Sequence, residues 1–126
     1  MHYASPRHEH LYRNLTRGRG YRPHTLAALF LLTARRKLWK RWCAGAVSNA
    51  GIDWTAGRDI ETGWDGFYLE RAARSIAGQE ENPITLHNLL SHTDYPTELI
   101  LLVLTALLLA RGERVPKSKQ KRRQTC

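Results

Sequence analysis

Apolar residues recur at helical spacing along most of this chain. The first set, which shares one face of a helix, consists of His8, Leu11, Tyr12 and Leu15. Ser5 is a favoured helix cap, and Pro6 is a favoured first helical residue. Gly18 follows the last apolar position and is a residue at which helices end. The pattern therefore predicts a first helix from Pro6 to just before Gly18.

A second helix is predicted to begin near Pro23, and its sequence is apolar on nearly every side. Residues 26–32 include only alanine, leucine and phenylalanine. A helix without a polar face belongs in the centre of a domain, so we expect this one to be the most buried. Its continuation over residues 35–42 is basic, with Trp39 and Trp42 interleaved among the cations.

Residues 43–61 are small, rich in glycine and without periodicity, which predicts a loop with Ile52 and Trp54 packed against the core. Thr62 and Asp65 resemble a capping box and predict the start of a third helix. Its expected inner face is formed by Trp64, Phe67, Tyr68, Ala72 and Ile76. Glu70 and Arg74 are four residues apart and should form an ion pair, and Gly78 should end the helix.

Two further helices are expected, a short one over Thr85–Ser91 and a long one that Asp94 or Tyr95 caps and that ends at Gly112. The apolar run Leu99–Ala110 would be about 18 Å long as a helix, whereas the hydrocarbon of a bilayer is about 30 Å thick. We therefore expect a buried core helix rather than a short membrane anchor. Residues from Glu113 onward lack apolar periodicity and are expected to be a disordered basic tail.

These segments predict an all-α fold, because alternating strand patterns are missing from the sequence. The expected architecture is a compact bundle of about five helices around a central apolar helix. Residues 1–112 form the helical domain in this interpretation, and residues 113–126 form the tail.

Charge divides the chain into three parts. Residues 1–41 carry ten Arg or Lys and one acid, a net charge of +9, whereas residues 42–110 carry a net charge of −6 and residues 111–126 a net charge of +6. Such a division is typical of a protein whose surface meets a charged partner. Guanidinium and ammonium groups neutralise phosphates, and Trp39, Trp42 and Tyr21 could stack on bases.

We therefore predict a surface that contacts nucleic acid. Its residues would be Arg17, Arg19, Tyr21, Arg22, Arg35, Arg36, Lys37, Lys40 and Arg41, together with Lys117, Lys119, Lys121, Arg122 and Arg123 of the tail. The alternative is a solvated helix end whose cations face the helix C-terminus and whose tryptophans lie in the core.

A second candidate surface is acidic and consists of Asp53, Asp59, Glu61 and Asp65. These carboxylates could imitate phosphates and occupy a basic cleft on a partner protein. Their spacing is not that of a calcium-binding loop.

No catalytic, cofactor or metal-binding signature accompanies these surfaces. The histidine pairs, His8 with His10 and His87 with His92, lack the three- or four-residue spacing that zinc sites on helices use. Cys43 is expected to be a small core residue beside Trp42. Two cysteines form no disulfide framework, so a cytoplasmic location is expected. We predict a binding protein rather than an enzyme, with no cofactor and no metal.

One resemblance rests on the order of short segments along the chain. The segments are His8-Glu9-His10-Leu11-Tyr12, the apolar helix Leu26–Ala34, Leu38-Trp39, Leu69-Glu70-Arg71-Ala72-Ala73, Leu86-His87-Asn88-Leu89-Leu90 with Asp94, and the final aliphatic helix. In this order the chain resembles an uncharacterised family of short helical proteins carried by phages and conjugative elements of Gram-positive bacteria. The resemblance covers about residues 8–111 and implies an accessory protein of a mobile element.

Three functions follow as hypotheses. The first is an interaction protein of a phage or mobile element whose basic surface binds nucleic acid or a nucleoprotein complex. The second is an inhibitor of a host defence nuclease, such as an anti-CRISPR protein, that acts through the acidic residues. The third is a membrane-tethered accessory protein, although a membrane is not the partner that we expect.

Overall fold

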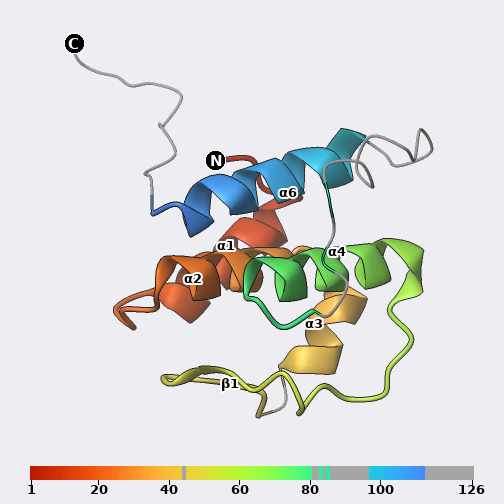
Figure 1. Ribbon diagram of the computed structural model, residues 1–126, viewed down its shortest axis with the longest axis horizontal. Coiled ribbons are helices and arrows are strands. Elements are labelled where there is room, and N and C mark those ends of the chain that lie inside the picture. Colours follow the sequence, from red (N-terminus) through yellow and green to blue (C-terminus); the bar gives the residue numbers. More distant parts are fainter. Residues whose placement is uncertain (44, 81–82, 84, 86–96, 113–126) are drawn as a thin grey trace.

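The computed structural model describes residues 1–43, 45–80, 83, 85 and 97–112 (Figure 1). These residues form five helices and one short antiparallel hairpin, so the mainly helical fold predicted from the sequence is confirmed. The elements are α1 (Pro6–Thr16), α2 (Pro23–Leu32), α3 (Arg36–Trp42), β1 (Val47–Ser48), β2 (Gly51–Ile52), α4 (Gly63–Ile76) and α6 (Thr97–Ala110). The expected helix over Thr85–Ser91, the caps Asp94 and Tyr95 and the basic tail fall outside the described residues, apart from Thr85 itself.

Helix α2 lies at the centre of the domain, as its all-round apolar sequence predicts. Residues 27–32 are fully buried, and the most extensive packing of α2 is against α6 and α4. Figure 1 shows α6 at one end of the molecule, α2 and α4 in the middle, and α3 with the hairpin at the other end. Burial of each large side chain, such as Phe30 or Leu31, stabilises the fold by about 1.5–3 kcal/mol.

Helix α1 supplies the polar groups that α2 lacks at its C-terminal end. The last turn of α2 has no basic residue, and its final carbonyls need donors from elsewhere. His8 Nε2 contacts the Phe30 carbonyl at 2.7 Å, and Arg7 Nη2 donates to the Thr33 carbonyl at 3.1 Å. The Thr33 hydroxyl donates to the Leu29 carbonyl at 2.7 Å. These contacts satisfy the carbonyls of Leu29, Phe30 and Thr33 at a helix end that lies inside the protein.

His8 is held as a neutral ring by its two partners. The Ala4 amide donates to Nδ1 at 2.9 Å, so Nε2 carries the proton that the Phe30 carbonyl accepts. The side chain is completely buried. Burial is the main reason that the pKa of His8 falls to about 4.

The chain breaks between α2 and α3, where the sequence predicts one continuous helix. Thr33 ends α2, and Arg35 is extended, with φ −127° and ψ 137°. A straight continuation would carry Trp42 about 15 Å beyond the end of α2, away from the core. The break instead turns α3 back, so that Leu38 and Trp42 are fully buried. Packing therefore overrides the local helical preference of this segment.

Helix α4 buries part of its predicted inner face: Tyr68 and Ala72 are buried and Ile76 packs against the core, but the prediction is wrong for Trp64 and Phe67. Tyr68, Leu69, Ala72 and Ala73 point into the core, whereas Trp64 is 55% exposed and Phe67 is 67% exposed. The expected Glu70–Arg74 ion pair is present at 3.3 Å, and the helix ends before Gly78, whose φ is +73°.

The capping box predicted at the start of α4 is wrong. Thr62 precedes the helix without a side-chain capping bond, and the Asp65 carboxylate is instead in an ion pair with Arg35 at 2.8 Å.

The core predictions for residues 52 and 54 and for the last helix are confirmed. Ile52 and Trp54, in the loop that carries the hairpin, pack against the core. Helix α6 buries Leu99, Leu102, Val103 and Ala106, and the chain turns at Gly112 with φ +77°. None of the helices in the described ranges combines the length and the apolar character that a membrane span needs.

Candidate nucleic-acid interface

Helix α3 presents a row of cations to solvent. Arg36, Lys37 and Lys40 are exposed, and within the described part of the chain no hydrogen bond or ion pair engages their side chains. The opposite side of the same helix places Leu38 and Trp42 in the core. The burial of these two residues therefore fixes the direction in which the cations point.

Helix α1 brings another cation to the place where the chain turns from α2 into α3, which we call the corner. Arg7 of α1 is half-buried and donates to the Thr33 carbonyl at 3.1 Å. Burial, and then the positive charges of Arg36 and Arg35, lower the pKa of Arg7. Three arginines from two distant parts of the sequence therefore gather at this corner. We name Arg7, Arg35, Arg36, Lys37 and Lys40 the corner cations.

The sequence did not indicate Arg7 as a site residue. It stands alone beside Pro6 and His8, and no run of charge or spacing marks it. Only the packing of α1 on the end of α2 brings it to the corner, through the bonds from His8 and Arg7 to the last carbonyls of α2.

Two of the predicted cations are paired with carboxylates of this same chain. Arg35 Nε lies 2.8 Å from Asp65 Oδ2, and Arg41 Nε lies 2.7 Å from Glu70 Oε1. Arg41 also donates to the Arg58 carbonyl. Arg41 is therefore a structural residue in this fold. Arg35 nevertheless remains a candidate site residue, because it lines a hollow at the corner. This hollow has a volume of about 280 Å³ and is lined by Arg35, Arg36, Lys37, Thr62, Gly63 and Asp65.

Arg17, Arg19 and Arg22, in the turn between α1 and α2, are exposed. Arg19 donates to the Asn49 side chain at 2.9 Å, and the Tyr21 hydroxyl donates to the Ser48 carbonyl at 2.8 Å, so this turn is joined to the hairpin. The turn precedes α2 whereas the corner follows it, and the length of α2 separates the two groups by about 15 Å. The predicted basic residues thus form two groups rather than one.

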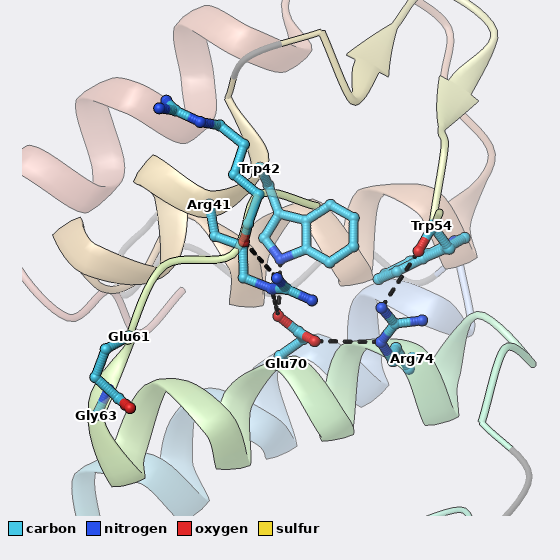
Figure 2. A network of polar contacts seen from close by, with 8 residues as sticks. Arg41, Trp42, Trp54, Glu61, Gly63, Glu70 and Arg74 are labelled. Carbon is cyan, nitrogen blue, oxygen red and sulfur yellow. Dashed lines mark hydrogen bonds and ion pairs between the residues drawn. The ribbon is translucent and has the colours of Figure 1, made fainter. Parts of the chain in front are cut away.

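Trp42 belongs to an internal cluster around Glu70, shown in Figure 2. Its Nε1 donates to Glu70 Oε1 at 2.9 Å, and its ring packs edge-on against Trp54 with centroids 5.3 Å apart. The guanidinium of Arg74 lies over both rings, 5.4 Å from the centroid of Trp42 and 5.3 Å from that of Trp54. Trp42 is fully buried and cannot stack on a base.

Glu70 is the acceptor at the centre of this cluster. Burial alone would raise the pKa of Glu70, but the hydrogen bonds from Arg41 and Trp42, the charge of Arg41 and the bond from Arg74 hold it below the usual value. The cluster joins α3, α4 and the loop that carries Trp54.

The four predicted acidic residues do not form one patch. Asp53 accepts from the Thr55 hydroxyl and amide, and these bonds lower the pKa of Asp53. Asp65 is paired with Arg35. Asp59 and Glu61 remain together and line a pocket of about 350 Å³ whose other residues are Arg41, Ile60, Thr62, Phe67 and Glu70. Figure 2 shows Glu61 accepting from the Gly63 amide, a contact of 2.8 Å.

Two exposed aromatic side chains, Trp64 and Phe67, accompany this acidic pair. Trp64 stacks on Tyr68, with centroids 6.4 Å apart and planes 12° apart. Phe67 lines the same pocket as Asp59 and Glu61. The sequence placed both aromatics in the core because they follow helical spacing. The core side of α4 is instead formed by Tyr68, Leu69, Ala72 and Ala73.

The described residues include no group of three or more His, Cys, Asp or Glu side chains that could hold a metal ion. Cys43 is exposed, so its prediction as a core residue is wrong. Because Trp42 points inward at the end of α3, the next residue points outward. The predicted tail residues Lys117, Lys119, Lys121, Arg122 and Arg123 lie outside the described residues.

Comparisons with protein-family models, with curated proteins and with solved structures find no match to this chain. Function is therefore argued from the chemistry of these surfaces alone.

Proposed function

We propose that this protein binds nucleic acid through the corner cations, with the phosphate backbone as its ligand. The observation that supports this proposal is a concentration of positive charge that the fold does not neutralise. Arg36, Lys37 and Lys40 are exposed and, among the described residues, unpaired, and Arg7 and Arg35 stand beside them. Among the carboxylates that the structure describes, Asp65 alone is paired with a member of this group.

Like charges held this close repel one another, and a polyanion relieves that repulsion. Each phosphate that a Lys or Arg neutralises releases a condensed counterion, which favours binding at low salt. Trp39, the aromatic residue of α3 between Lys37 and Lys40, is half-buried and packs against the core. Contacts of Lys and Arg with phosphate go to the backbone rather than to base edges. We therefore expect binding that depends little on nucleotide sequence. The turn that carries Arg17, Arg19 and Arg22 and the basic tail would add further phosphate contacts.

The test compares two double variants that change the net charge equally. Lys37→Gln with Lys40→Gln removes two corner cations, and Arg13→Gln with Arg58→Gln removes two exposed cations elsewhere. Affinity for a short duplex is measured by fluorescence anisotropy over a range of salt concentrations. We expect the first variant to reduce the slope of log K against log salt by about 1.8, since each lost phosphate contact removes about 0.9.

The second variant is the matched control and should change the slope by less than half as much. Equal effects of the two variants would mean that the protein responds to net charge alone, and the corner would not be the site. An absence of binding by the unaltered protein at low salt would reject the proposal itself. The double variant Arg17→Gln and Arg22→Gln alters the turn between α1 and α2. The same salt-dependent affinity measurements on this variant show whether the turn and the corner cations contact one duplex.

A second candidate function rests on the exposed aromatic and acidic residues of the pocket described above. Phe67 and Trp64 offer apolar area to a partner, and Asp59 and Glu61 offer negative charge beside it. Exposed aromatic side chains are enriched where proteins bind one another. We propose, as the alternative, that this surface occupies a basic nucleic-acid cleft of a host defence nuclease and inhibits it.

Inhibition is tested on purified CRISPR nucleases that cleave a plasmid. If this function holds, cleavage stops when the protein is added, and Phe67→Ala or Asp59→Asn with Glu61→Gln restores it. Lys37→Gln with Lys40→Gln should still inhibit, which separates this function from competition for the DNA. Inhibition that is lost only in the Lys37/Lys40 variant would reject the second candidate and favour the first.

A further inference from the structure

Helix α6 is apolar on its outer side as well as on its inner side. Its outer face carries Leu101, Leu104, Leu107 and Leu108, which are between 39% and 46% exposed. They follow one another at the three- and four-residue spacing that places side chains on one face of a helix. No charged residue lies between Glu98 and Arg111. We call these four residues the outer leucine face.

An uncharged leucine face of this kind is uncommon on the surface of a soluble monomer. Scattered exposed leucines are normal, but a continuous apolar stripe marks a site of interaction. The inner side of α6 already packs on α2 and α4 through Leu99, Leu102 and Ala106. The outer leucines are therefore not needed to hold α6 in the fold.

Positive charge is concentrated at the C-terminal end of this face. Gly112 lies beside the start of α2, since a Cβ at Gly112 would be 3.5 Å from Pro23 Cγ. The exposed Arg22 precedes Pro23, and the exposed Arg111 directly follows α6. The sequence then continues with Arg114, Lys117, Lys119, Lys121, Arg122 and Arg123 against the single acid Glu113.

We propose that the outer leucine face and the adjoining cations dock on the surface of an anionic lipid bilayer. Helix α6 is about 21 Å long, and its outer leucine face spans about 11 Å of that length, so the helix can lie in the plane of the bilayer with this face at the boundary between headgroups and acyl chains. Clusters of four to eight Lys or Arg beside such a helix attract anionic headgroups, each contributing to affinity. The helix lies on the bilayer and does not cross it.

A second copy of this chain fits the same face less well. It would cover the leucines, but it would bring together two chains that each carry a net charge of +9. It would also offer no counter-charge to the cations that follow α6. An anionic bilayer would cover the leucines with apolar acyl chains and would pair the cations with headgroups. The charge of this surface therefore favours a bilayer over a second copy of the chain.

The test is sedimentation of the full chain with vesicles. Vesicles of phosphatidylcholine with phosphatidylserine are compared with vesicles of phosphatidylcholine alone. Leu104→Gln with Leu108→Gln alters the outer leucine face, and Phe67→Gln is the matched control, because it makes the same kind of change at an exposed apolar residue of α4. We expect the unaltered protein and the Phe67 variant to bind the anionic vesicles, and the leucine variant to bind at least about tenfold more weakly.

Neutralising the tail, by Lys117→Gln, Lys119→Gln and Lys121→Gln, should also weaken binding to the anionic vesicles. A lack of vesicle binding by the unaltered protein would overturn the proposal. Unchanged binding by the leucine variant would overturn it as well, because the tail would then be the sole attachment. A dimer in solution that the leucine variant abolishes would assign the face to a second copy and overturn it too. Leu101→Gln alone, checked by its thermal melting, replaces the double variant if that one does not fold.

This proposal and the proposed nucleic-acid function fail separately. The leucine variant should retain duplex binding, and the Lys37/Lys40 variant should retain vesicle binding, because the outer leucine face and the corner cations share no residue.

Discussion

At the scale of single residues, the fold depends on polar groups that are buried with their partners. His8 links α1 to the end of α2 through the Phe30 carbonyl and accepts from the Ala4 amide. Glu70 holds two arginines and a tryptophan. In both cases one side chain satisfies groups from more than one element, so its loss affects several contacts at once.

The pKa of His8 makes stability depend on pH. The ring titrates near pH 4 in the folded protein and near 6.5 when unfolded, so the unfolded chain binds more protons between these values. Stability should therefore be greatest above pH 6.5 and should fall as the pH falls, by about 3 kcal/mol by pH 4 from this group. Below pH 4 this loss should level off.

Urea unfolding of the protein and of His8→Gln, measured between pH 7 and pH 4, checks this prediction. The variant should be less stable at pH 7, because it loses the paired imidazole, but its stability should fall less steeply with decreasing pH. Equal slopes for the two proteins would show that His8 is not the responsible group.

Replacing Glu70 by glutamine should destabilise the protein by about 2 kcal/mol. The amide cannot balance the charges of Arg41 and Arg74, and hydrogen bonds to charged groups contribute about 1.5–3 kcal/mol. Unfolding followed by the fluorescence of the buried Trp42 measures the change. Glu61→Gln is the control, since the exposed Glu61 keeps an acceptor for the Gly63 amide and should change stability by less than about 0.5 kcal/mol. A loss as large in the control would contradict a special role for Glu70.

At the scale of elements, the sequence predicts where helices begin and end better than how they pack. Ser5 and Pro6 mark the start of α1, and Gly78 and Gly112 lie just beyond the ends of α4 and α6, because caps and positive φ angles are local properties. The break before α3 depends instead on where the core lies.

The side of a helix that faces the core is likewise set by its neighbours. Trp64 and Phe67 have the spacing of core residues, yet they are exposed, and Leu69 and Ala73 are buried together with the expected Tyr68 and Ala72. The candidate site was predicted in part for the same reason. Arg36, Lys37 and Lys40 are exposed cations as expected, but the pairing of Arg41 with Glu70 and the approach of Arg7 depend on contacts between distant segments.

Gly66 tests the packing of the first turns of α4. A Cβ at this position would lie 2.7 Å from Thr62 Cβ and 2.9 Å from its hydroxyl, and Leu38 of α3 is close behind. Alanine normally favours a helix over glycine by about 1 kcal/mol. Here we expect Gly66→Ala to destabilise by about 1–3 kcal/mol, because the overlap forces a backbone shift.

Urea unfolding of Gly66→Ala measures the cost, and the same change in a Thr62→Gly background isolates the overlap. Removal of the Thr62 side chain should abolish most of the destabilisation that Gly66→Ala causes. A stabilised Gly66→Ala variant would mean that the turn adjusts freely and that helix preference decides the outcome.

At the scale of the whole molecule, charge and apolar surface are distributed unevenly over the fold. Helix α3 carries its exposed cations at one end of the molecule, and the outer leucine face of α6 lies at the other, with α2 and α4 between them (Figure 1). The exposed acidic residues Asp59 and Glu61 lie near the start of α4.

This separation predicts that the two proposed ligands bind without competition. The affinity for a duplex should be the same, within about twofold, in the presence and absence of saturating anionic vesicles. Fluorescence anisotropy with a labelled duplex, before and after the vesicles are added, measures it. Release of the duplex by the vesicles would show that both ligands use the same cations.

The central position of α2 has a consequence for how such a protein would work. Because the buried helix α2 packs against both α4 and α6, side chains fill the middle of the domain between its two ends. The molecule would then act as a spacer with unlike ends. It would fix the distance between a nucleic acid bound at α3 and a bilayer bound at α6. Its function would be to hold these two ligands close together rather than to transmit a signal between them.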